Sequence, residues 1–354
     1  MAYLSIIALF LPLIFLLWLA NVADKRRNAT PAKRDVVILV YVLLGLVWGT
    51  LLAVAVFAVL MGVAYARYAD IDALSAHYSA QGLNPEVVVQ FMKSLPRLGS
   101  GLFVLAVVGI ALLLRPVRRL LARLIPISVH RVTHTVALTY SVFILVNLWL
   151  VMGIGLETVA DAITAAPDTP SGQMIALLWL QNVMLALMAF IGVGWLSRRR
   201  WRSALLRLGL TWSGWKNVSL GIGLGLGMFL FLFPLSLLLE KTGLGVDPNI
   251  ENLTEKLIGP LVTSLPGVIS LGAAAALGEE LTYRGALQPR FGIFLTALLF
   301  ALTHNQYGVS LATLVVFFLG LALGWTRVRY NTTTSIFLHA TYNIAIGLAG
   351  FLFH

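Results

Sequence analysis

Apolar runs long enough to cross a membrane recur along the whole chain of 354 residues. A helix needs about 20 apolar residues to span a hydrocarbon core that is about 30 Å thick. We expect about ten such spans, centred near residues 3–22, 36–63, 98–114, 133–155, 174–196, 218–239, 262–289, 291–306, 309–326 and 333–352. The sequence therefore predicts an all-α, polytopic helical membrane protein with about ten transmembrane helices.

Composition agrees with this interpretation, because 59% of the residues are hydrophobic and only 11% are charged. A soluble domain could not bury so much apolar surface. Cysteine is absent, which excludes disulfides, thiol nucleophiles and cysteine-ligated metal sites. The net charge of +11 does not indicate nucleic-acid binding, because Lys and Arg cluster between the apolar runs, as in cytoplasmic loops. We expect the lipid bilayer, and no nucleic acid, as a partner.

Basic loops alternate with loops that are poorer in basic residues and contain Asp and Glu. The basic loops are residues 23–34, 115–131, 197–216 and 327–332. Because cytoplasmic loops carry the excess of Lys and Arg, we expect these four loops in the cytoplasm and both termini outside it. The first span lacks a basic segment before it, so we expect a retained helix and not a signal peptide.

The chain divides best at the basic, Trp-containing segment Arg198–Lys216, which we expect to lie at the membrane interface. Residues 1–205 then form an N-terminal transmembrane module to which the sequence assigns no role, and residues 206–354 form the core. The glycines of Gly221–Gly227 fall inside a span, where small residues allow close helix packing. Asn147, Gln181 and Asn182 also lie in spans, where amides commonly link helices by hydrogen bonds.

Four ionisable residues, Glu279, Glu280, His304 and His339, fall deep inside the predicted spans. An ionisable group at membrane depth indicates a functional site. At about 1.5 Å per residue, Glu279, His304 and His339 lie roughly 16, 20 and 15 Å from the cytoplasmic ends of their helices. Three antiparallel helices can therefore bring them to one level.

Glu280 and Arg284 have i, i+4 spacing, so they can form an ion pair along one helix face. Glu279 lies about 100° around the axis and lacks that partner, which suits it to act as a general base. With His304, it could position and deprotonate a water. His339 and Asn343, again i, i+4, are donors suited to stabilise an oxyanion. The reaction class that this set predicts is peptide-bond hydrolysis without a covalent intermediate.

Three motifs in this set resemble those of a known family: Glu279-Glu280-x-x-x-Arg284, Phe300-x-x-x-His304 and His339-x-x-x-Asn343. They resemble, in order, the motifs of the CPBP intramembrane proteases (CAAX proteases and bacteriocin-processing enzymes). The resemblance covers roughly residues 206–354. It implies that Glu279 and His304 activate water and that His339 and Asn343 form the oxyanion hole. It also implies that Glu280 and Arg284 organise the site, while Phe300 gives packing support.

Other interpretations remain open beside this one. Glu280 with Arg284 also fits a purely structural ion pair, and Asn343 a simple link between helices. Glu279, His304 and His339 could supply three zinc ligands, but there is no HExxH motif, and we favour a site without metal or cofactor. The same cavity would also serve a non-catalytic scaffold or a bacteriocin-immunity protein. A transporter is disfavoured, because no inverted repeat is visible.

The expected function is therefore an intramembrane, metal-independent glutamic endopeptidase. Its substrates would be membrane-associated peptides or proteins, cut near the cytoplasmic side. Short loops and the lack of an organelle-targeting segment indicate the plasma (inner) membrane of a prokaryote, where prenylated substrates, known for eukaryotic relatives of the family, are not expected.

Overall fold

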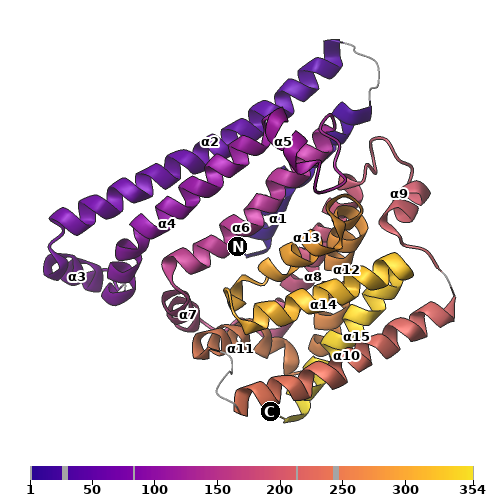
Figure 1. Cartoon of the computed structure of the whole chain (residues 1–354). Helices are drawn as coiled ribbons and strands as arrows, with labels where there is room; N and C mark the ends of the chain where they lie inside the picture. The colour runs from indigo at the N-terminus through magenta and orange to yellow at the C-terminus, as the bar shows by residue number, and fades with distance from the viewer. Residues whose placement is uncertain (1, 26–30, 83, 213, 242–246, 354) are drawn as a thin grey trace.

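The computed structural model describes residues 2–25, 31–82, 84–212, 214–241 and 247–353, and every regular element in them is a helix (Figure 1). The N-terminal helices are α1 (Ala2–Lys25), α2 (Pro31–Tyr68), α3 (Ile71–Ala80), α4 (Pro85–Leu112), α5 (Arg115–Leu121), α6 (Val132–Ile154), α7 (Leu156–Thr164), α8 (Ser171–Gly192) and α9 (Trp201–Leu208). The others are α10 (Trp215–Lys241), α11 (Pro248–Val262), α12 (Leu265–Glu280), a π-helix (Leu281–Leu287), α13 (Gln288–Leu302), a 3₁₀ turn (Asn305–Tyr307), α14 (Leu311–Arg329) and α15 (Thr332–Phe353).

Nine helical runs in these described residues are long and apolar enough to cross a membrane. Large apolar side chains on them, such as Leu46, Phe57 and Phe231, are more than 60% exposed, which suits a surface solvated by lipid. The predicted all-α, multi-pass membrane architecture is confirmed. Figure 1 shows α2 and α4 as a long pair along one edge, with α10, α14 and α15 at the opposite edge.

One of the nine runs, Leu265–Leu302, contains the reversal that separates two of the ten expected spans. Its 38 residues would measure about 57 Å as one straight helix, which is too long for a single crossing. Gly292 has φ 77° and ψ 172°, values that interrupt the helix. The Arg284 guanidinium lies only 4.2 Å from the centre of the Phe300 ring. Since 16 residues of straight helix would separate them by about 24 Å, the chain folds back at Gly292.

The second arm of this hairpin packs against α14 through small residues. A Cβ on Gly320 would lie 3.2 Å from Ala297, and one on Gly324 would lie 2.8 Å from Ile293. From Gly292 to Leu302 the arm rises only about 15 Å, half of the hydrocarbon thickness. The predicted span 291–306 is therefore wrong at its end, because the α-helix ends at Leu302 and His304 lies outside it.

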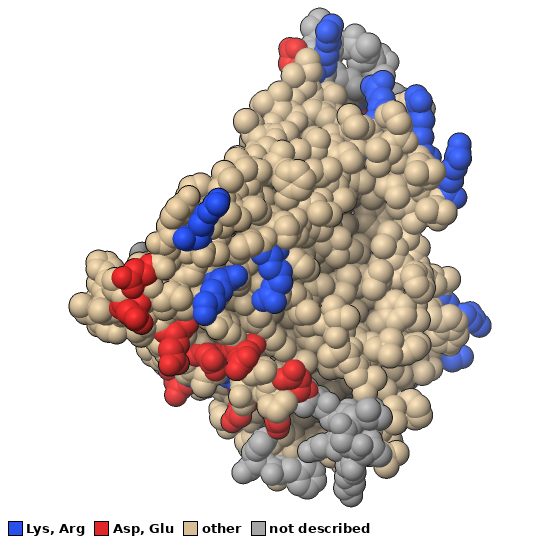
Figure 2. All heavy atoms as spheres, turned by 60° about the vertical axis from the view of Figure 1, so that its left-hand side comes forward, with Lys and Arg blue, Asp and Glu red and all other residues tan. Residues whose placement is uncertain are grey.

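Charged residues separate toward opposite ends of the helix bundle. Figure 2 shows Asp and Glu gathered at the lower left, and most Lys and Arg toward the top and right. Arg115, Arg119 and Arg123 of the α5 region, Arg198–Arg200 and Arg202 beside α9, and Arg327 and Arg329 at the end of α14 make up what we call the basic end. The predicted basic segment 115–131 contains helix α5, and residues 26–30 of the first basic loop lie outside the described residues.

Glycines set the closest helix contacts. A Cβ added to Gly221 would lie 2.7 Å from the Thr334 carbonyl oxygen, and one on Gly225 would lie 2.5 Å from that of Leu338. Gly223 and Gly227 meet nothing within 4 Å. The close packing expected for this segment is therefore present on one face of α10, and it presses α10 onto the helix that carries His339.

Candidate active site

Small residues position α12, which carries the two adjacent glutamates. Ser264 caps its first turn by accepting a hydrogen bond from the Gly267 amide at 3.3 Å. A Cβ on Gly272 would lie 2.7 Å from the Ala340 carbonyl oxygen of α15, and one on Gly278 would lie 2.5 Å from the Asn182 side chain of α8. Helix α12 is therefore held between α8 and α15, with Glu279 and Glu280 at its last turn.

Glu280, Arg284 and His339 form a buried network. The Arg284 Nη1 donates to Glu280 Oε1 at 2.9 Å, and His339 Nδ1 lies 3.0 Å from the same oxygen. Arg284 Nη2 also donates to the Gly320 carbonyl of α14 at 3.2 Å. Glu280 is fully buried, and the ion pair expected from its i, i+4 spacing with Arg284 is present. The network joins three segments and compensates the charge that it buries.

Glu279 has different surroundings from its neighbour. Its side chain is 22% exposed, and its Oε2 lies 3.9 Å from His339 Nε2, which is beyond hydrogen-bond distance. Among the described residues, Oε2 is buried and finds no hydrogen-bond donor. Glu279 is thus the more accessible carboxylate of this pair.

The ring of Phe300 lies at the centre of the site. Its centroid is 5.1 Å from that of His304 and 5.8 Å from that of His339, both edge to face. The Arg284 guanidinium covers it at 4.2 Å, and Tyr283 packs on it at 5.4 Å. Phe300 therefore brings the three motifs together by direct contact, as expected for packing support.

His304 follows α13 instead of lying within it, because φ −83° and ψ 59° take it out of the helix. Its expected place on one helix face with Phe300 is corrected, although the two residues stay in contact. His304 Nδ1 lies 3.0 Å from the Phe300 carbonyl oxygen. A carbonyl can only accept, so Nδ1 carries the proton, and Nε2 of the neutral ring remains free to accept one.

The loop around His304 is anchored on α6 at two points. Asn305 donates to the side chain of Asn147 on α6, and a Cβ on Gly308 would lie 3.1 Å from Met152 of the same helix. Tyr307 stacks on the His304 ring with centroids 5.9 Å apart. The loop that carries His304 is therefore held against α6.

Asn343 lies one turn beyond His339 on α15 and is half-buried.

Sequence reasoning missed four contributors to the site: Tyr283, Tyr307, the Gly320 carbonyl and the π-helix. The π-helix directly follows the two glutamates, and Arg207 of α9 donates to its Gly285 carbonyl at 3.0 Å. Single π-turns frequently mark functional sites, but their hydrogen-bond shift leaves no pattern in residue type. In the part of the chain that the structure describes, no three His, Asp or Glu side chains are grouped to hold a metal ion.

Comparison with known proteins agrees with the motifs. Residues 261–345 match the family model described as "Type II CAAX prenyl endopeptidase Rce1-like", a segment that contains every candidate site residue. An 80-residue stretch is 32% identical to the "Uncharacterized protein YpbD" of Bacillus subtilis (strain 168), and covers 21% of this chain and 42% of that protein. The chain thus spans less than half the length of this relative. No solved structure matches the chain. The predicted resemblance to CAAX proteases is confirmed for residues 261–345.

Proposed function

Because residues 261–345 match the Rce1-like family model of CAAX prenyl endopeptidases, we propose that this chain is an intramembrane endopeptidase in which Glu279 and His304 activate water. The observation that carries the proposal is the contrast between two adjacent carboxylates. Glu280 is fully buried and its Oε1 is paired with Arg284, whereas Glu279 is 22% exposed and has no Arg or Lys partner within ion-pair distance among the described residues. The Oε2 atoms of both side chains lack a donor there, so the contrast rests on exposure and on the Arg284 pair. A general base must be free to take a proton.

In the proposed reaction, Glu279 takes a proton from water while the Nε2 of His304 accepts a hydrogen bond that orients it. The hydroxide adds to the carbonyl carbon of the scissile peptide bond, and the carbonyl oxygen becomes an oxyanion. When this intermediate collapses, the C–N bond breaks and Glu279 returns its proton to the leaving amine. No covalent bond to the enzyme forms, and no metal is required.

His339 and Asn343 are proposed to stabilise the oxyanion. Glu280 accepts from Nδ1 of His339, which fixes one proton on that nitrogen. His339 can donate from Nε2 to the oxyanion only when the ring carries both protons. Asn343 adds a neutral amide donor from the next turn of α15.

We place the basic end in the cytoplasm of a prokaryotic cell, and we propose membrane-associated peptides or proteins as substrates. The experiment is a comparison of membrane peptides from cells that express the wild type with those from cells that express Glu279→Gln. Peptides with new termini should be present only with the wild type. Identical peptide sets, with both proteins present at equal levels in the membrane, would instead favour a non-catalytic scaffold.

A further inference from the structure

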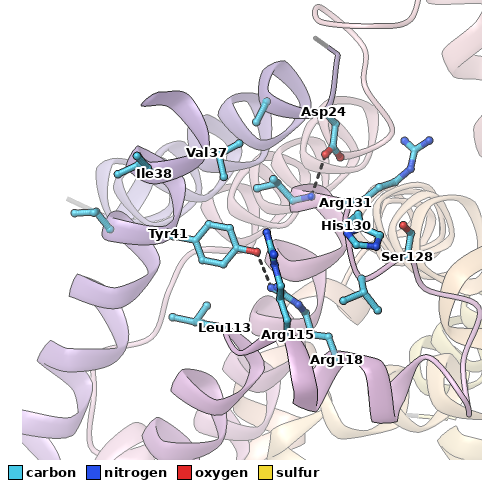
Figure 3. Close-up of a pocket in the computed structure, with 14 residues that line it drawn as sticks. Asp24, Val37, Ile38, Tyr41, Leu113, Arg115, Arg118, Ser128, His130 and Arg131 are labelled. Atoms are coloured by element: carbon cyan, nitrogen blue, oxygen red, sulfur yellow. Dashed lines mark hydrogen bonds between the residues drawn. The ribbon is translucent and has the colours of Figure 1, made fainter. Parts of the chain in front are cut away.

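A cavity of about 800 Å³ opens at the basic end, in the N-terminal helices (Figure 3). It lies between the end of α1, the third turn of α2, the start of α5 and the segment that leads into α6. None of the proposed catalytic residues lines it. These helix ends meet where basic residues gather, the level at which phospholipid headgroups lie if the bundle spans the membrane.

Arg118 is the central cation of this cavity. Its side chain is only 2% exposed, and Nη1 donates to the Tyr41 hydroxyl at 2.7 Å and to Thr135 Oγ1 at 2.5 Å. Figure 3 shows the Tyr41 hydroxyl pointing at this guanidinium, with the hydrogen bond drawn as a dashed line. Within the described residues, no carboxylate lies within ion-pair distance of Arg118, and its buried Nε has no acceptor. A buried guanidinium without a counter-charge is costly, so an anion is needed here.

Asp24 lines the same cavity but is engaged elsewhere. Its Oδ1 accepts from the Val132 amide at 3.0 Å, and its Oδ2 accepts from the Thr133 amide and hydroxyl at 3.2 and 2.6 Å. The carboxylate thereby caps the N-terminus of α6, whose first amides have no partner within the helix. It does not neutralise Arg118.

Two further arginines, Arg115 and Arg131, line the cavity with exposed side chains. With Arg118 they make three cations against the single acid Asp24. Their side chains are free to reorient toward a ligand, whereas Arg118 is fixed by its two hydroxyl partners. Arginine suits phosphate in particular, because its planar fork of N–H donors matches two phosphate oxygens at once.

The opposite wall of the cavity is apolar and faces outward from the bundle. Ile38 and Val42 of α2 line it and are 49% and 51% exposed. On a membrane-spanning helix such side chains contact lipid tails. The cavity therefore joins a cationic interior to an apolar wall that faces the bilayer. Binding of a soluble anion would require only the cationic interior, whereas binding of a lipid would use both.

We infer that this cavity binds one anionic membrane phospholipid, with its phosphate at Arg118, Arg115 and Arg131 and its acyl chains along Ile38 and Val42. Basic pockets between transmembrane helices on the cytoplasmic side are suited to anionic headgroups. The inference concerns the N-terminal helices and is independent of the proposed peptidase activity.

The test uses the full-length protein in detergent micelles, with native mass spectrometry to measure the dissociation constants of added lipids. Phosphatidylglycerol should bind as a single retained molecule, and phosphatidylcholine should not. The variant Arg115→Gln/Arg131→Gln should weaken phosphatidylglycerol binding by about 25-fold, or about fivefold for each basic residue removed. Both side chains are exposed, so this variant should fold. Arg118→Lys should also weaken binding, because it keeps the charge but loses the fork.

The matched control is Arg119→Gln/Arg123→Gln, which removes two exposed arginines of the same region that do not line the cavity. It should bind phosphatidylglycerol like the wild type. Equal weakening by this control would show a diffuse surface charge effect and overturn the proposed site. Equal retention of phosphatidylcholine would overturn it as well. Displacement of phosphatidylglycerol by equimolar inorganic phosphate would show a soluble anion site and refute the lipid assignment.

Discussion

At the scale of single residues, substitution of each of the two adjacent glutamates by glutamine should affect a different property, catalysis for Glu279 and stability for Glu280. Glu279→Gln preserves size but cannot take a proton at neutral pH. General-base catalysis contributes typically 10²–10⁴-fold, so cleavage of a membrane peptide should fall at least about 100-fold while the yield of folded protein stays unchanged. The measurement is single-turnover cleavage by purified protein, with thermal unfolding as the control for stability.

Glu280→Gln should act mainly on stability. It leaves Arg284 buried without its counter-charge, and breaking a buried pair in this way costs about 3–5 kcal/mol. The double change Glu280→Gln/Arg284→Gln removes both charges and should recover part of that loss, as measured by thermal unfolding in detergent. If Glu280→Gln folded normally but failed to cleave, while Glu279→Gln cleaved normally, the two roles would have to be exchanged.

Metal independence is a further prediction at this scale. A carboxylate and a histidine can activate water without a metal, so cleavage should persist in 1,10-phenanthroline or EDTA. The zinc content of active protein, measured by atomic emission, should be far below one per chain. Activity lost on chelation and restored selectively by zinc would support Glu279, His304 and His339 as zinc ligands instead.

At the scale of elements, α6 should matter for catalysis although it lies outside the matched family segment. Asn147 holds Asn305, the neighbour of His304. Asn147→Leu removes this bond, and a hydrogen bond is worth about 0.5–1.5 kcal/mol. We therefore expect cleavage to fall about two- to tenfold with little change in stability. Gln181→Leu, an exposed amide-to-leucine change in another span, is the control and should cleave normally.

A comparison of the observed helices with the expected spans shows which features could be predicted from the sequence. The apolar runs predicted nearly every membrane helix, because length and hydropathy decide whether a segment can cross lipid. The i, i+4 spacing predicted the Glu280–Arg284 pair, which is local to one helix. Three features depend on contacts between distant segments and could not be predicted: the π-helix, the bond from His339 to Glu280 and the turn that carries His304. The reversal at Gly292 was predicted to within about three residues, by the break between the expected spans 262–289 and 291–306.

At the scale of the whole molecule, the charge separation predicts one orientation in the membrane. The native chain has no cysteine, so a single introduced cysteine can be labelled without background from other residues. Ser203→Cys at the basic end and Ala166→Cys at the opposite end replace exposed residues. An impermeant maleimide added to intact cells should label residue 166 and not residue 203, because cytoplasmic loops carry the excess of Arg and Lys. Labelling of residue 203 alone would show that the protein has the opposite orientation in the membrane.

The short second arm of the α12–α13 hairpin has a consequence for the helices before it. The segment 303–310 follows an arm that rises only about 15 Å, so in a bundle that spans the membrane it would lie at membrane depth outside any α-helix. Hydrocarbon offers no hydrogen-bond partner to a peptide group that protein leaves unpaired there. Such a segment persists only where protein encloses it, and α6 and α11 contact it here. Helix α6, which belongs to residues 1–205, would then shield one side of this segment, while α11 of residues 206–354 shields another. Excised from α6, residues 206–354 would expose that side of the segment to lipid, and another protein would have to cover it.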